Sequence, residues 1–173
     1  MYAYNTYNQH KLTYGVGNYG KDTQHYFITS SASGYASYIN TAMSEWVNTT
    51  SSMGVTTPIS YTKTTTQSSS RMDIYQVSTV NEWWGLTTMY NGSTEVDPFS
   101  SNLAWGKIQL DADFSDLSEN KRLAVIAHEM GHVMGLAHSD FSNVLMRADI
   151  AYNSSSTSRA QTNDLGGINY LYK

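Results

Sequence analysis

Eleven consecutive residues in the last third of the chain are the most informative part of the sequence. Residues 128–138 have the sequence His-Glu-Met-Gly-His-Val-Met-Gly-Leu-Ala-His. His128 and His132 are four residues apart, so on a helix they lie on one face, one turn apart. Both imidazoles can then reach a single ion at about 2.0–2.1 Å, the usual zinc–nitrogen distance. The segment therefore predicts a helix that binds a metal.

Gly135 predicts where this helix ends and how a third ligand joins the first two. A glycine adopts a positive φ at little cost and so turns the chain sharply. The turn would bring His138 back toward the ion. Three protein ligands leave one coordination position for water, which is the pattern of catalytic zinc sites. Glu129 follows the first histidine, so we expect its carboxylate beside the ion as a general base.

Hydrophobic patterns on both sides of the motif predict an α/β fold. Five segments have the pattern of short strands: residues 25–29, 59–63, 71–77, 85–90 and 107–110. Three sets of apolar residues have helical spacing: Ile39, Ala42, Met43 and Trp46; Leu123, Ile126, Ala127, Met130 and Met134; Leu165, Ile168 and Leu171. The second helix is expected to start near Asp116 or Ser118, and Asp116 with Glu119 resembles a capping box there. This order of elements is typical of helices packed on a twisted sheet.

The composition sets the broad class of the protein. The chain has 173 residues, which fits one domain over residues 1–173. Charged residues make up 14%, against an average of about 25%, and 14 tyrosines argue against disorder. No apolar run approaches the roughly 18 residues of a membrane span. The net charge of −4 and the lack of a Lys/Arg cluster give no support to nucleic-acid binding.

The residue types also bear on chemistry and location. The chain has no cysteine, so disulfides, thiolate zinc sites and cysteine nucleophiles are excluded within it. Few charges and many Ser, Thr, Asn and Tyr residues suggest a secreted bacterial protein. The first residues lack the basic and apolar regions of a signal peptide, so we expect a mature form. We expect a monomer that acts on a protein or peptide, without nucleic acid or membrane as a partner.

The motif resembles the signature of the metzincin metalloproteases, H-E-x-x-H-x-x-G-x-x-H. Met146 ends the stretch Asn-Val-Leu-Met, which is similar to the Met-turn of that group. Ser139 directly after the third histidine, and residues 163–172 near the C-terminus, are similar to the matrixin branch. The resemblance implies an α/β (α+β) fold with a twisted, five-stranded, mostly parallel sheet. One antiparallel edge strand, three helices and a zinc cleft complete that fold.

The resemblance also implies an activity and residue roles. It implies a secreted zinc endopeptidase, with Zn²⁺ held by the three histidines of the motif. Met146 would form an apolar surface beneath the imidazoles and would not touch substrate. An extended substrate is expected to pair with the strand near residues 86–90, beside Leu86 and Thr87, because an exposed strand edge can bind a peptide.

The specificity pocket is expected one helical turn before the first ligand. Residues four apart share a helix face, so Ala124 should lie below His128, toward the pocket wall. The resemblance places the opposite wall after Met146, in residues 147–158. Alanine projects only a methyl group, so the pocket is expected to accept a large apolar side chain.

Two departures from the matrixin pattern concern other metals. Thr88 and Gln109 stand where the family has histidine ligands of a second, structural zinc, so that zinc is not expected. Asp111, Asp113 and Asp116 could bind calcium, because hard cations take carboxylate oxygens. Alternatively, the three are solvated loop acids and helix caps, which is the interpretation we favour.

Two other functions remain open from the sequence. One is a non-catalytic zinc-binding module, such as an adhesin or a degenerate protease. Retention of Glu129 argues against it, because zinc binding alone does not require that carboxylate. The other is a different metzincin branch with a narrow substrate range, which the sequence does not separate from the first interpretation.

Overall fold

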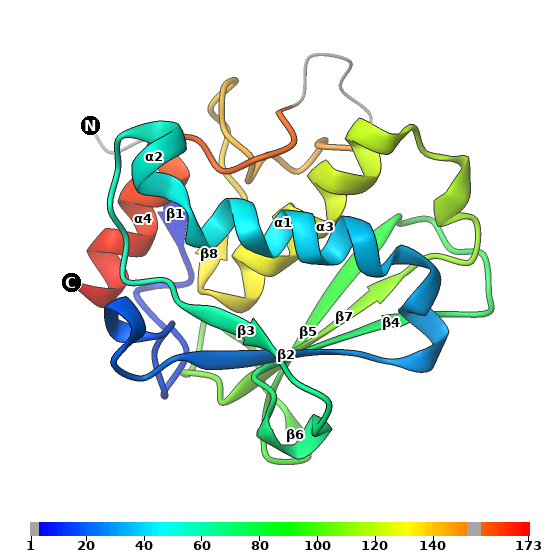
Figure 1. Ribbon diagram of the computed structural model, residues 1–173, viewed down its shortest axis with the longest axis horizontal. Coiled ribbons are helices and arrows are strands. Elements are labelled where there is room, and N and C mark those ends of the chain that lie inside the picture. Colours follow the sequence, from blue (N-terminus) through cyan, green and yellow to red (C-terminus); the bar gives the residue numbers. More distant parts are fainter. Residues whose placement is uncertain (1–3, 152–156) are drawn as a thin grey trace.

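The protein is a twisted sheet with helices packed on one face (Figure 1). The computed structural model describes residues 4–151 and 157–173. The main sheet has the strand order β3-β2-β4-β7-β5-β6. Its strands are β2 (Gln24–Ile28), β3 (Tyr61–Lys63), β4 (Met72–Gln76), β5 (Gly85–Asn91), β6 (Thr94–Glu95) and β7 (Trp105–Leu110).

The pairing confirms a mostly parallel sheet with an antiparallel strand at one edge. Strands β3, β2, β4 and β7 are parallel, and β5 runs antiparallel to β7. The short β6 adds a sixth strand to the five that were expected. It pairs with β5 only at Tyr90 and Asn91, so it does not pair with residues 85–89. Both residues of β6 are exposed and polar, which explains why the apolar pattern did not indicate this strand.

A second, two-stranded sheet connects the beginning of the chain to the motif. Strand β1 (Asn5–Thr6) pairs antiparallel with β8 (Leu136–Ala137). Strand β8 directly follows Gly135 and directly precedes His138. The N-terminal segment therefore lies beside the third histidine of the motif.

In the described residues, four α-helices and four short 3-10 helices complete the fold. The α-helices are α1 (Ala36–Val47), α2 (Thr49–Met53), α3 (Glu119–Val133) and α4 (Thr162–Tyr172). The 3-10 helices are η1 (Asn18–Gly20), η2 (Ser30–Tyr35), η3 (Gln67–Ser69) and η4 (Phe114–Asp116). The three expected helices are present, with α2 as a short addition. None of the helices in the described part of the chain is long and apolar enough to cross a membrane.

Helices α1 and α3 lie side by side over the sheet (Figure 1). The four apolar residues predicted for the first helix are all buried in α1. One of them, Trp46, donates its indole N–H to the backbone oxygen of Ala127 in α3 across 3.0 Å. This contact fixes the motif helix against its neighbour.

The start of α3 differs from the predicted capping box. Asp116 lies in η4, and the residue that precedes the first turn of α3 is Ser118. No side chain at that position bonds the free N–H groups of the first turn. The similarity to a capping box was wrong because a separate 3-10 turn ends before α3 begins.

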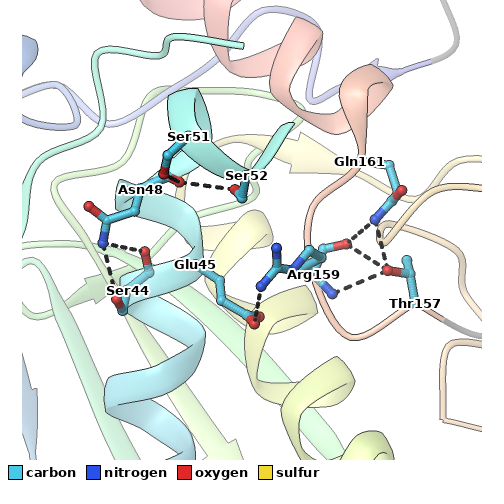
Figure 2. Close-up of polar contacts among 8 residues, drawn as sticks. All are labelled: Ser44, Glu45, Asn48, Ser51, Ser52, Thr157, Arg159 and Gln161. Atoms are coloured by element: carbon cyan, nitrogen blue, oxygen red, sulfur yellow. Dashed lines mark hydrogen bonds and ion pairs between the residues drawn. The ribbon is translucent and has the colours of Figure 1, made fainter. Parts of the chain in front are cut away.

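The segment that leads into α4 is held against α1 (Figure 2). Arg159 forms an ion pair with Glu45 of α1, with 2.6 Å between guanidinium nitrogen and carboxylate oxygen. The Gln161 amide donates to Thr157 Oγ1 and to the backbone oxygen of Arg159, at 2.8 and 2.9 Å. These contacts set the position from which α4 starts.

Candidate metal centre and cleft

The motif helix and the turn after it bring the three histidines together. His128 and His132 lie in the last turns of α3 and are buried. The helix ends at Val133, and Gly135 has a φ of +95°. A Cβ at Gly135 would also lie 2.9 Å from the Leu171 side chain, so the turn needs glycine for two reasons. After β8, His138 faces the other two rings.

The three Nε2 atoms converge on one point. Nε2 of His138 lies 3.2 Å from Nε2 of His128 and 3.2 Å from Nε2 of His132. Nitrogens bound to a tetrahedral zinc at 2.0–2.1 Å are about 3.3–3.4 Å apart, so this spacing fits zinc. It is also the only group of three or more metal-binding side chains of this kind among the described residues. The triad is therefore positioned to bind a metal ion.

Backbone carbonyls orient the two buried rings. Nδ1 of His128 lies 2.9 Å from the oxygen of Leu145, and Nδ1 of His132 lies 2.8 Å from the oxygen of Leu136. A carbonyl only accepts, so these contacts assign the proton to Nδ1 and leave Nε2 free to bind a metal. Metal-binding histidines commonly have such a partner on the second ring nitrogen.

Burial keeps the three imidazoles neutral. It lowers the pKa of His128 to about 4 and the pKa of His132 well below its usual value. It also lowers the pKa of His138. A neutral imidazole is the form that binds a metal, so the site is ready for an ion at neutral pH.

Glu129 is buried in the cleft beside the triad. Its carboxylate accepts a hydrogen bond from Thr87 Oγ1 of β5 at 2.7 Å. A Cβ at Gly85 would lie 2.8 Å from Glu129 Cγ, so only glycine lets β5 come this close. Burial raises the pKa of Glu129 to about 7, while the Thr87 bond opposes this shift. A buried carboxylate with one donor can accept a proton during a reaction.

Met146 packs against α3 at Gly131, between the metal-ligand positions His128 and His132. A Cβ at Gly131 would lie 2.4 Å from the Met146 sulfur, so the helix carries glycine where this side chain packs. Asp164 of α4 fixes the turn, because its carboxylate accepts the backbone N–H groups of Leu145 and Met146 at 2.8 and 3.3 Å. Met146 is 2% exposed and thus lies in the core beside the helix.

A pocket of about 240 Å³ lies on one side of His128. Ala124 is 1% exposed and is not among the described residues that line it. The next residue, Val125, lines the pocket instead, because a step of one residue rotates the helix face by about 100°. Val125, and not the predicted Ala124, therefore forms this part of the pocket wall.

The other side of this pocket is lined by part of the segment that follows Met146. Ala148, Ile150 and Ala151 line this pocket from the segment after Met146. Residues 152–156 of the predicted wall lie outside the described residues. Trp83, Trp84 and Gly85 close the pocket from the β5 side.

A larger groove of about 570 Å³ follows the exposed edge of β5. Leu86 and Thr87 line it, together with Tyr7, Thr88, Met89, Glu95, Val96, Asp97 and Pro98. Tyr7 and residues 95–98 were not predicted from the sequence, because they are distant from the motif along the chain. No local motif marks them.

Asp111, the first of the acidic residues considered for calcium, accepts hydrogen bonds from the chain itself. The Asp111 carboxylate accepts the backbone N–H of Asn81 at 2.7 Å and the backbone N–H of Asp113 at 2.9 Å. Asp116 belongs to the separate turn η4. Among the described residues, the carboxylates of Asp111, Asp113 and Asp116 do not lie close enough together to form one group of three metal-binding side chains.

The fold and the histidine triad are those of a zinc metallopeptidase. The family model described as Matrixin, for peptidases of family M10, matches residues 6–173. The chain therefore belongs to the matrixin family, whose members are zinc metalloendopeptidases.

Comparisons with individual proteins add little to this assignment. No curated protein matches the chain. The solved structure of myroilysin is similar over 67% of this chain, with 14% sequence identity and a TM-score of 0.44. The matched region is 48% of the myroilysin chain, so this chain spans about half the length of that protein.

Proposed function

We propose that this chain is a secreted endopeptidase that hydrolyses peptide bonds in proteins or peptides, with Glu129 as its general base. The observation that carries the proposal is the position of one buried carboxylate beside three converging imidazole nitrogens. The Glu129 carboxylate is held there by Thr87, and the cleft continues along the free edge of β5. Zinc binding alone requires neither this carboxylate nor the open strand edge.

The residues present fit a three-histidine zinc site, with His128, His132 and His138 as ligands. A zinc ion bound there would polarise the scissile carbonyl, lower the pKa of water toward about 7 and stabilise the developing negative charge. Glu129 accepts a proton from the attacking water and then donates it to the leaving amine. Thr87 keeps the carboxylate oriented through both transfers.

The edge of β5 supports binding of an extended peptide. Residues 85–88 pair with β7 on one side only, whereas Met89 accepts a hydrogen bond from the Val96 N–H at 2.9 Å and β6 pairs with β5 from Tyr90 onward. A peptide that adds to this edge would form main-chain hydrogen bonds and place alternate side chains in the groove. The residue after the scissile bond (P1′) would enter the pocket beside His128 and Val125, which suits a large apolar side chain.

An extracellular location and a monomeric state complete the proposal. The support for secretion is the composition, which is low in charge and rich in Ser, Thr, Asn and Tyr. Fractionation of the source cells would test the location, and sedimentation equilibrium would test the oligomeric state. Accumulation inside the cells, or a stable dimer, would contradict this part.

The alternative is a non-catalytic zinc-binding module, such as an adhesin-like or degenerate protease domain. A casein digestion assay with zinc-loaded protein, with and without a chelator, separates the two functions. The proposal expects cleavage that the chelator abolishes and that added zinc restores. Zinc-loaded protein that cleaves neither casein nor a peptide library would favour the alternative.

A further inference from the structure

Tyr7 contacts the metal-ligand set from outside the motif. Its hydroxyl oxygen lies 2.8 Å from Nδ1 of His132 in a buried environment. This nitrogen is on the far side of the ring from Nε2, which faces His138. Tyr7 therefore contacts a ligand from behind and does not occupy the ion's own position.

Two oxygens surround the Nδ1 proton of His132. One is the backbone oxygen of Leu136 and the other is the hydroxyl of Tyr7, each at 2.8 Å. When Nε2 binds a metal, Nδ1 carries the proton and acts as a donor. The Tyr7 oxygen then serves as a second acceptor, which restricts rotation of the ring and increases the basicity of the ligand.

Tyr7 is itself held in place. Its ring packs edge-on against Phe99, with 4.9 Å between centroids and an interplanar angle of 85°. The preceding residue, Thr6, pairs with Leu136 in the β1–β8 ladder. The same strand contacts a second ligand, because the Asn5 amide donates to the backbone oxygen of His138 at 2.8 Å.

We propose that Tyr7 is a positioning residue for the metal ligand His132. Its hydroxyl oxygen is one of the two acceptors of the hydrogen bond that the Nδ1–H group donates, and it holds the ring with Nε2 directed at the ion. The N-terminal strand thus increases the affinity of a site that lies about 125 residues away along the chain. This inference rests on the proposed zinc site.

The test measures zinc affinity of the full chain by competition with a chelator. Tyr7→Phe removes the hydroxyl oxygen and keeps the ring against Phe99. We expect about 10-fold weaker zinc binding, the lower end of the range for such partners, because Leu136 remains as an acceptor. Zinc release on acidification should also begin at a higher pH than in the wild type.

Tyr26→Phe is the matched control. Tyr26 is also a buried tyrosine, and its hydroxyl donates to Asn40 Oδ1 at 2.9 Å, away from the metal centre. This variant should lose a comparable hydrogen bond and keep the zinc affinity of the wild type. Equal affinities in the two variants, whether unchanged or weakened together, would overturn the positioning role.

A second variant keeps the inference testable if Tyr7→Phe does not fold. Phe99 is 52% exposed, so Phe99→Ala should fold while it frees the Tyr7 ring. We expect a loss of zinc affinity in the same direction but smaller than about 10-fold. Wild-type affinity in this variant would contradict the inference. Wild-type protein that binds no zinc would instead refute the proposed function, and this inference with it.

Discussion

Thr87 Oγ1 donates a hydrogen bond to Glu129 Oε2 across 2.7 Å, and this bond joins the edge strand of the sheet to the motif helix. The same strand approaches the helix closely at Gly85, where a Cβ would lie 2.9 Å from Glu129 Oε1. The position of the carboxylate is therefore set by β5, whose other edge is open to a peptide. In the proposed mechanism, substrate binding and proton transfer therefore depend on the same strand.

Glu129→Gln tests the general base. The amide has the same shape but cannot accept the proton, so kcat should fall by at least about 100-fold. Zinc content and thermal stability should be retained, because the histidines supply the ligands. Glu119→Gln, at the exposed start of the same helix, is the control and should keep full activity. Activity of Glu129→Gln within a few-fold of the wild type would refute the mechanism.

Val125→Ala tests the pocket beside His128. Removal of two methyl groups from the wall should deepen the pocket and favour larger P1′ side chains by about 10-fold or more, as one methylene is worth 1–3 kcal/mol. Val133→Ala is the control, since Val133 is a buried valine of α3 that does not line this pocket. A peptide-library profile measures the preference. An unchanged P1′ profile in Val125→Ala would exclude this pocket as the specificity site.

Asp164→Ala tests the contact between α4 and the Met146 turn. The carboxylate is buried and accepts N–H groups from Leu145, Met146 and Gln161. Its loss leaves these donors unpaired and should lower the free energy of unfolding by about 1–3 kcal/mol. Asp149→Ala, which breaks a half-exposed pair with Arg147, should lower the free energy of unfolding far less. Thermal unfolding measures the free energy of unfolding of both variants. An equal decrease in the two would show that the buried Asp164 contact stabilises the fold no more than the surface pair does.

Metal-free protein should lose stability in mildly acidic solution. The pKa of His128 is about 4 in the folded chain, against 6.5 as its ordinary value. Between these values His128 binds more protons in the unfolded chain, which lowers the free energy of unfolding as the pH decreases. Glu129 has the opposite effect, because its pKa is raised to about 7 in the folded chain. The lowered pKa values of His132 and His138 add to the effect of His128, so the free energy of unfolding falls from pH 6.5 toward 4. Chelator-treated protein, unfolded by urea at several pH values, provides the measurement. His128→Gln should flatten this dependence, and an equally steep slope in that variant would contradict the assignment.

Local signals in the sequence predicted the motif helix, the positive φ of Gly135 and the burial of α1 and α4. Each depends on the spacing of neighbouring residues, because helical and strand periods and glycine turns are local properties. The five main strands follow for the same reason. The family resemblance then correctly predicted a mostly parallel sheet with an antiparallel edge.

Contacts between distant segments could not be predicted in the same way. Tyr7 meets His132 only because β1 pairs with β8, and the two-residue β1 has no strand pattern. The exchange of Ala124 for Val125 in the pocket wall depends on the rotation of α3 against β5. Residue spacing fixes the positions of side chains relative to one another on a helix. It does not fix which of these side chains face the sheet and the pocket, because that depends on the rotation of the helix about its axis.

Zinc content is the measurement that tests the central claim most directly. The purified protein, saturated with zinc and dialysed against metal-free buffer, would be analysed for zinc per chain. One zinc ion per chain is expected, because His128, His132 and His138 form one site. His138→Ala in the same protocol should retain far less. Protein that retains no zinc, or two tightly bound ions per chain, would contradict the account.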